Sequence, residues 1–132
     1  MNRNFKIIIY LLMSFIISCK KEAGEGGSSS ISGKVYVKNY NANFTKLNKE
    51  YYSSNESVYI IYGNELSYGN NIKTSYDGVY EFKFLRKGNY KLFTYSKDSS
   101  LKSASGTIAV IAKIEIKDNN EIVKVPDLVI FK

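Results

Sequence analysis

Few residues of this 132-residue chain could carry out chemistry. It contains no histidine and only one cysteine, Cys19. The lack of histidine removes the commonest general base and the usual Ser-His and Cys-His nucleophile pairs, and it removes zinc sites built from cysteine and histidine. No glycine-rich phosphate loop of standard spacing occurs. Only carboxylates, lysines and tyrosines are left for catalysis, so the sequence predicts a protein that is not an enzyme and holds no cofactor.

The single cysteine lies at the end of an N-terminal leader. Two basic residues precede an apolar run over 7–17, and Cys19 follows shortly after it. The residues at 16–19, Ile-Ile-Ser-Cys, resemble the lipobox of bacterial lipoprotein signal peptides, in which an aliphatic residue, a tolerant position and a small residue precede an invariant cysteine. The resemblance implies that residues 1–18 are cleaved off and that Cys19, now the first residue, carries acyl chains such as palmitate.

Two other interpretations of the leader stay open. A plain secretory signal peptide has the same charged and apolar regions, but Cys19 beside the cleavage site would then be a coincidence. A transmembrane anchor needs about 20 apolar residues, and the run at 7–17 is shorter than that. We therefore expect a lipid-anchored protein. Lys20 stands where enterobacterial lipoproteins of the inner membrane carry Asp, which favours the outer membrane, on its periplasmic face or at the cell surface.

Residues 19–30 are expected to form a flexible tether. After Cys19 the segment is charged, small or polar, with six Gly and Ser residues over 24–30 and no apolar face that could be buried. Chain of this composition behaves as a flexible coil. The predicted domains are therefore the leader at 1–18, the tether at 19–30 and one folded domain at 31–132.

Neither a metal nor a nucleic acid is an expected partner. The string Asp118-Asn119-Asn120-Glu121 offers oxygen ligands of the kind that calcium prefers, but such a string between two alternating segments is typical of a turn. The net charge of +7 is spread along the chain, without the basic stripe that is typical of nucleic-acid-binding proteins.

Tyrosines are the remaining candidates for ligand contact. The chain has 12, and their flat, amphipathic rings suit the faces of sugars. Tyr51, Tyr52 and Tyr59 lie in or beside a long polar stretch at 39–57. In an extended segment Tyr51 and Tyr52 point in opposite directions, so at most one of them can enter the core. The outward-facing ring would either cover a sheet edge or offer a stacking face to a glycan or peptide.

The segments that must position these side chains show a period of two, which is typical of half-buried strands. Asp77-Gly78 is a turn dipeptide, and Pro126 marks an edge or a bulge. About seven short strands separated by turns predict an antiparallel β-sandwich. The expected strands cover 31–38, 58–62, 71–76, 79–85, 90–96, 108–116 and 121–131.

The segment at 77–92, DGVYEFKFLRKGNYKL, resembles the signature of carboxypeptidase-regulatory-like domains, which belong with the Cna-B and transthyretin-like sandwiches. The resemblance implies an immunoglobulin-like or transthyretin-like β-sandwich. In it Gly88 would adopt a positive φ before the next strand, and Tyr90 would bury its ring while its hydroxyl reaches the backbone, as in a tyrosine corner. The residues in step with the signature are Gly78, Tyr80, Phe82, Leu85, Gly88, Tyr90 and Leu92.

Domains of this family serve as spacers, adhesin stalks, receptor extensions and enzyme appendages, so the resemblance fixes no single function. The sequence predicts a lipid-anchored module of the cell envelope with a structural or interaction role. The alternative is a glycan- or peptide-binding lipoprotein that works beside an outer-membrane transporter. An exposed, coplanar row of tyrosines would favour binding, whereas buried tyrosines would favour a spacer. The expected partners are the membrane and an envelope protein or glycan.

Overall fold

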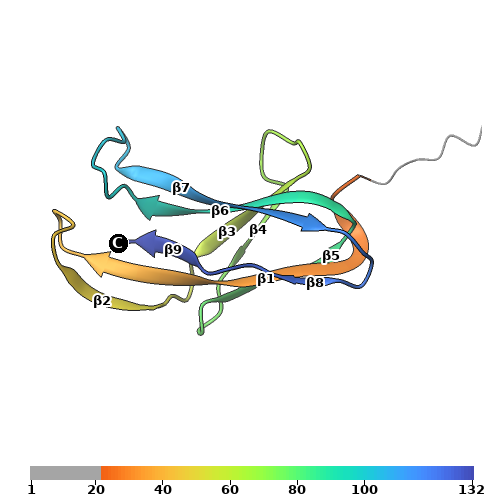
Figure 1. The fold of residues 1–132 in the computed structure, drawn as a ribbon, viewed down its shortest axis with the longest axis horizontal. Coiled ribbons are helices and arrows are strands. Elements are labelled where there is room, and N and C mark those ends of the chain that lie inside the picture. Colours follow the sequence, from red (N-terminus) through yellow and green to blue (C-terminus); the bar gives the residue numbers. More distant parts are fainter. Residues whose placement is uncertain (1–21) are drawn as a thin grey trace, which may run out of the picture.

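The computed structural model describes residues 22–132, which form two β-sheets packed face to face (Figure 1). This confirms the prediction of an all-β domain. No helix among these residues is long and apolar enough to cross a membrane. The strands are β1 (Glu25–Tyr40), β2 (Leu47–Tyr52), β3 (Ser57–Tyr62), β4 (Asn70–Lys73), β5 (Val79–Leu85), β6 (Gly88–Lys97), β7 (Thr107–Ile116), β8 (Ile122–Lys124) and β9 (Leu128–Phe131).

The first sheet is built around β1, the longest strand. Along one edge β1 pairs antiparallel with β5 and then with β2. Along its other edge β8 and then β9 run parallel to it. The prediction of a wholly antiparallel sandwich is therefore wrong for the C-terminal strands. Pro126 lies in the break between β8 and β9, where its missing N–H costs no ladder hydrogen bond.

The second sheet has the strand order β4-β3-β6-β7 and is antiparallel throughout. Alternating residues of both sheets fill the space between the layers. Ile31, Val35 and Val37 of β1 are completely buried, as are Val58 and Ile60 of β3. Burying one such aliphatic side chain contributes about 1.5–3 kcal/mol, so this interface holds the two layers together.

The fold departs from the expected one in the number and extent of its strands. There are nine, not seven, because β2 lies within the polar stretch at 39–57 and the last segment divides into β8 and β9. In addition, β1 begins at Glu25, so residues 25–30 belong to the sandwich and not to a flexible tether. Ser29 is buried there because its hydroxyl donates to the Asp118 carbonyl at 2.8 Å and accepts from the Glu121 N–H at 3.1 Å.

The predicted turns are present, but they connect the two layers and do not form hairpins. Gly78 has a φ of +77°, as a turn dipeptide requires, and it links β4 to β5 in the opposite sheet. The segment after β5 likewise crosses to β6, and the turn at 118–121 crosses from β7 to β8.

Gly88 and Tyr90 behave as the signature implies. Gly88 has a φ of +143°, and a Cβ atom there would lie 2.7 Å from the Cβ of Ala23. The Tyr90 ring is buried, and its hydroxyl donates to the Arg86 carbonyl at 2.6 Å while it accepts from the Gly24 N–H at 2.9 Å. Tyr90 therefore ties the start of β1 to the end of β5.

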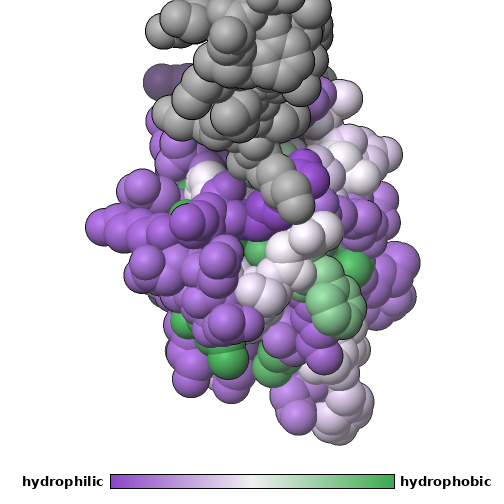
Figure 2. Space-filling view, turned by 90° about the vertical axis from the view of Figure 1, so that its right-hand side faces the viewer, coloured by the Kyte–Doolittle hydropathy of each residue, from purple (hydrophilic) through white to green (hydrophobic). Residues whose placement is uncertain are grey.

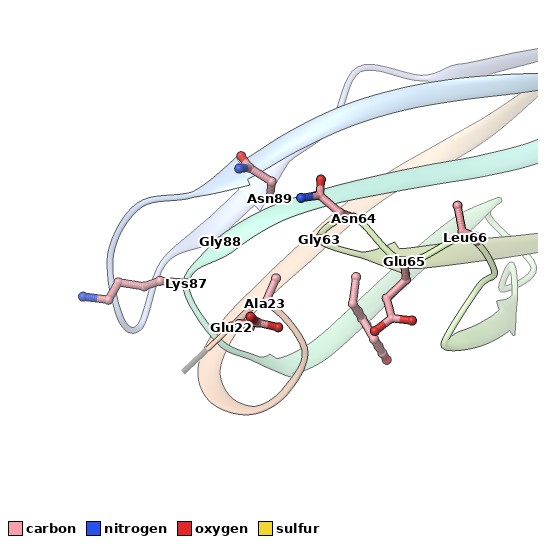
Figure 3. A pocket seen from close by; sticks show the side chains of 10 residues that line it. Glu22, Ala23, Gly63, Asn64, Glu65, Leu66, Lys87, Gly88 and Asn89 are labelled. Carbon is pink, nitrogen blue, oxygen red and sulfur yellow. The ribbon is translucent and has the colours of Figure 1, made fainter. Parts of the chain in front are cut away.

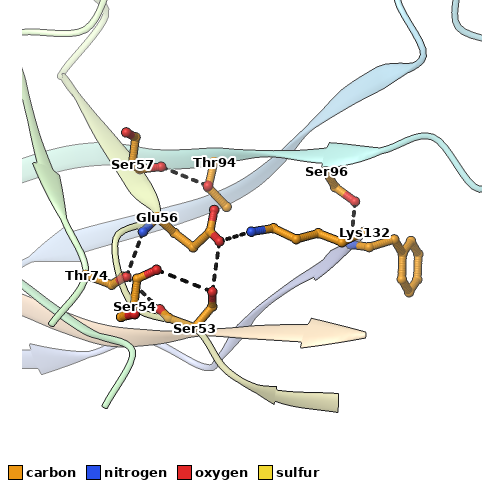
Figure 4. A network of polar contacts seen from close by, with 9 residues as sticks. Ser53, Ser54, Glu56, Ser57, Thr74, Thr94, Ser96 and Lys132 are labelled. Atoms are coloured by element: carbon orange, nitrogen blue, oxygen red, sulfur yellow. Dashed lines mark hydrogen bonds and ion pairs between the residues drawn. The ribbon is translucent and has the colours of Figure 1, made fainter. Parts of the chain in front are cut away.

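A polar network closes one end of the sandwich (Figure 4). The buried Thr74 hydroxyl donates to the Ser53 carbonyl at 2.6 Å and accepts from the Glu56 N–H at 2.9 Å. The Glu56 carboxylate accepts from the Ser53 hydroxyl and forms an ion pair with Lys132. These bonds satisfy polar groups that the packing of the layers removes from water.

Candidate functional site

Aromatic side chains gather on the outer surface of the four-stranded sheet. Val58 and Ile60 enter the core from β3, so Tyr59 between them must point outward. Tyr59 is paired across the sheet with Phe93 of β6, and the two rings stack with centroids 4.8 Å apart and planes 10° apart. Cross-strand packing of this kind stabilises the sheet. Because the two rings cover one face of each other, the apolar platform that they create outside the core consists largely of ring edges.

Two further tyrosines extend this platform. Tyr68, from the loop between β3 and β4, packs its ring edge-on at 4.8 Å from Tyr59, and Tyr95 lies 5.7 Å from Phe93. Tyr68 is 50% exposed and Tyr95 55% exposed. We call the group Tyr59, Tyr68, Phe93 and Tyr95 the aromatic face. Ile111 of β7, opposite Phe93 and 59% exposed, continues it toward the sheet edge.

Two lysines flank the aromatic face. Lys91 of β6 lies directly opposite Lys113 of β7, one row beyond the pair of Phe93 and Ile111. Neither lysine takes part in an ion pair among the described residues. Like charges placed opposite each other destabilise a sheet, so a bound anion at this position would relieve a repulsion that is built into the fold.

The structure separates the three tyrosines that the sequence singled out. Tyr59 belongs to the aromatic face, whereas Tyr51 and Tyr52 lie on β2 in the other sheet. As expected for adjacent strand residues, Tyr51 packs against the core and Tyr52 points outward. The three residues therefore do not form one site.

Tyr52 is already engaged by its neighbours. Its hydroxyl donates to Asp127 at 2.8 Å, which raises the pKa of Tyr52 above its ordinary value. Its ring packs edge-on against Tyr36, with centroids 5.0 Å apart, and the Lys34 ammonium lies 4.7 Å from the ring centroid. These contacts hold the Tyr52 ring in place, but Tyr52 is still 42% exposed, and its role as a ligand-contacting residue stays a prediction.

The remaining sequence candidates are Cys19 and the string at 118–121. Cys19 lies outside the described residues. In the turn at 118–121 the Glu121 carboxylate accepts hydrogen bonds from the backbone N–H groups of Lys117 and Asp118. Over residues 22–132 no cluster of three or more acidic, histidine or cysteine side chains could hold a metal ion.

Sequence reasoning missed Tyr68, Phe93 and Tyr95. Phe93 and Tyr95 alternate with the buried residues Leu92 and Thr94, so the alternation of residues along β6 predicts that both face outward. The pairing of Phe93 with Tyr59 depends on strand order, which a period of two does not reveal.

No protein-family model and no curated protein matches the sequence. Among solved structures, the fold is similar to that of a proposed carbohydrate-binding protein from Pseudomonas aeruginosa, with a TM-score of 0.51 and 14% sequence identity. The match covers 81% of this chain and 91% of that chain. A likeness at this level of identity shows a shared fold.

Proposed function

We propose that this protein is a lipid-anchored, non-catalytic module of the cell envelope that binds a glycan through its aromatic face. The observation that carries the proposal is the cluster of four aromatic rings on the outer surface of one sheet, in which Tyr68 and Tyr95 are exposed while Tyr59 and Phe93 are half-buried and stacked face to face. A purely structural spacer, the role that the sequence favoured, would not require this cluster.

The surroundings of the aromatic face indicate the class of glycan. The half-buried rings of Tyr59 and Phe93 and the exposed rings of Tyr68 and Tyr95 offer apolar surface to a sugar ring. The tyrosine hydroxyl groups can hydrogen-bond sugar oxygens. The opposed Lys91 and Lys113 add positive charge beside the rings. We therefore expect an acidic glycan to bind more tightly than a neutral one.

Two further observations support the proposed family and role. The buried Tyr90 with its backbone-bonded hydroxyl and the positive φ of Gly88 fit a carboxypeptidase-regulatory-like, transthyretin-like sandwich. The solved structure with a similar fold belongs to a proposed carbohydrate-binding protein, a role that fits ours. Attachment through Cys19 would place the module at the outer membrane, where envelope glycans are abundant.

A binding experiment tests the glycan proposal. We would screen residues 20–132 against acidic and neutral envelope glycans and measure the affinity of any hit by calorimetry. Tyr59→Ala and Tyr95→Ala should each weaken binding about two- to tenfold, since an aromatic contact contributes about 0.5–1.5 kcal/mol. Tyr51→Ala with Tyr52→Ala, on the opposite sheet, is the matched control and should bind normally. Binding that is lost only in this control would place the site on β2 instead.

Charge reversal at the lysines tests the class of glycan. The double substitution Lys91→Glu and Lys113→Glu should reduce binding of the acidic glycan and leave that of a neutral glycan nearly unchanged. If binding of both glycans fell equally, the substitutions would have disturbed the sheet itself, and the lysines would not contact the ligand.

The anchor has a separate test. Cys19→Ala should leave the leader uncleaved or the protein mis-sorted, and the variant should incorporate no labelled palmitate. Because an uncleaved variant keeps its apolar leader, labelling is a sharper measurement than detergent partitioning. Equal labelling of variant and wild type would contradict lipidation at Cys19.

A further inference from the structure

The folded domain begins only three residues after the proposed lipidation site. We infer that the end of the sandwich where the chain enters is held directly against the membrane surface, with Leu66 in contact with lipid. This inference rests on the proposed lipid anchor at Cys19. It replaces the expectation of a long, flexible tether with that of a short and restrictive one.

Hydrogen bonds fix the chain as far back as Glu22. The Arg86 guanidinium donates to the Glu22 carbonyl at 2.7 Å, and the Arg86 N–H donates to the Gly24 carbonyl at 2.9 Å. Ala23 packs against the core, and the buried Gly24 N–H donates to the Tyr90 hydroxyl. These contacts join the first described residues to the rigid body of the sandwich.

Only Lys20 and Lys21 then separate Glu22 from Cys19. Even fully extended, the three steps from Cys19 to Glu22 span about 10–11 Å. Acyl chains buried below the lipid headgroups would therefore leave the domain within contact distance of the membrane. A 12-residue tether would have let it move about 17–21 Å away, the average span of a flexible chain of that length.

The residues around the entry point form what we call the entry end: Ala23, the loop at 63–66 and the segment at 86–89. A groove of about 660 Å³ joins them, with Glu22 and Ala23 lying between Leu66 on one side and Lys87 on the other (Figure 3). The Leu66 side chain is completely exposed and packs against no other part of the described chain. Because single exposed apolar side chains are common on protein surfaces, the short tether carries the inference. Leu66 is the apolar side chain beside the entry point that lipid would meet.

The chemistry of this end fits a lipid surface better than a protein partner. The face of the molecule that Figure 2 shows is mostly hydrophilic, with separate hydrophobic spots in place of a continuous patch. Stable protein interfaces bury a larger, continuous area with an apolar centre. The groove at this end is lined by Leu66 together with the amides of Asn64 and Asn89 and the charged Glu65 and Lys87. This end therefore offers one apolar side chain among polar groups to the lipid headgroups.

A fluorescence experiment tests the contact. The chain contains no tryptophan, so the substitution Leu66→Trp introduces a unique reporter at a fully exposed position. The lipidated variant, purified from membranes, would be reconstituted into vesicles of phosphatidylethanolamine and phosphatidylglycerol with or without brominated acyl chains. We expect a blue-shifted emission and loss of most of the fluorescence in the brominated vesicles.

Two matched variants test whether the contact depends on the position of the tryptophan and on the length of the tether. Leu101→Trp replaces an exposed leucine in the loop at the far end of β6, a strand of 10 residues that spans about 30 Å, and its emission should be unaffected by bromine. Inserting 16 Gly and Ser residues between Lys21 and Glu22 adds an average span of about 20–24 Å to the tether. In the brominated vesicles, this insertion should restore the fluorescence that the Leu66→Trp variant loses on the natural tether.

The outcomes separate the inference from the proposed anchor. The inference is supported if the protein floats with the vesicles and bromine strongly quenches only the Leu66→Trp variant with the natural tether. Flotation without that quenching would overturn the contact and leave the lipid anchor standing. Failure of the purified protein to float with vesicles would overturn both.

Discussion

Two buried tyrosines are predicted to respond in opposite ways to the loss of their hydroxyl groups. Tyr90 and Tyr80 are both almost completely buried. The Tyr90 hydroxyl donates to the Arg86 carbonyl and accepts from the Gly24 N–H. The Tyr80 hydroxyl has no hydrogen-bond partner among the described residues, and burial raises the pKa of Tyr80 far above its ordinary value. The substitution Tyr→Phe therefore removes two hydrogen bonds at one position and an unsatisfied group at the other.

The expected magnitudes follow from this difference. A buried hydrogen bond contributes about 1 kcal/mol, and a buried group left without its partner costs about 1–3 kcal/mol. Tyr90→Phe should therefore lower the free energy of unfolding by about 2–3 kcal/mol, and Tyr80→Phe should leave it unchanged or raise it. For a domain of about 100 residues, each kcal/mol corresponds to about 4–8 °C in the melting temperature. Urea unfolding followed by circular dichroism would measure both variants.

The control is Tyr95→Phe, because Tyr95 is more than half exposed and its hydroxyl lies in solvent. This substitution should change the free energy of unfolding by less than about 0.5 kcal/mol. The reasoning would be refuted if Tyr90→Phe and Tyr80→Phe destabilised the domain equally. It would also fail if Tyr90→Phe behaved like Tyr95→Phe, since the start of β1 would then not depend on the Tyr90 hydroxyl.

Three further predictions concern Gly88, Asp98 and Thr74. Gly88→Val should destabilise the domain by about 1–3 kcal/mol from the positive φ at this position alone. It should destabilise more than Gly106→Val, because only at Gly88 would the new Cβ crowd Ala23. Equal melting temperatures of the two variants would contradict this. Hydrogen bonds, first from the Ser100 hydroxyl, lower the pKa of Asp98 from 3.8 to about 2. These hydrogen bonds stabilise the folded protein fully when the pH is above 3.8, the pKa of Asp98 in the unfolded chain, and this stability is lost as the pH falls through about 2, its pKa in the folded protein. The urea midpoint of the wild type should therefore drop between these two pH values, and that of Asp98→Asn should drop less. Thr74→Val leaves two buried backbone groups without partners and should cost about 1–3 kcal/mol by urea unfolding, whereas Thr74→Ser should cost less.

Hydrophobic alternation located most of the fold. The segments that became β3, β5, β6 and β7 were predicted to within a few residues, because each alternates between the core and the outside. β2 was missed because five of its six residues are exposed and the sixth is only half-buried, so its pairing leaves no apolar pattern in the sequence. The start of β1 was missed for a different reason. Its small polar residues are buried through hydrogen bonds to residues about 90 positions away, which no local pattern encodes.

The candidate site was predictable only in part. Tyr59 was singled out from its ring chemistry, and the outward direction of Phe93 and Tyr95 was contained in the period of β6. Their assembly into one face requires β3 to lie beside β6, which brings together Tyr59 and Phe93, 34 positions apart in the sequence. A parallel strand and an antiparallel strand share the same period of two, so the parallel pairing of β8 and β9 could not be read from the sequence either.

The pairing of β1 with four other strands has a consequence for how the chain reaches its native state. Two of these partners, β8 and β9, come from the last eleven residues, so one edge of β1 stays unpaired until nearly the whole chain is available. Contacts of such large sequence separation slow folding, and an open strand edge is a template for pairing with other molecules. Newly synthesised molecules would therefore be most prone to aggregate before their C-terminal strands dock, and molecules truncated before Ile122 would keep that edge open permanently.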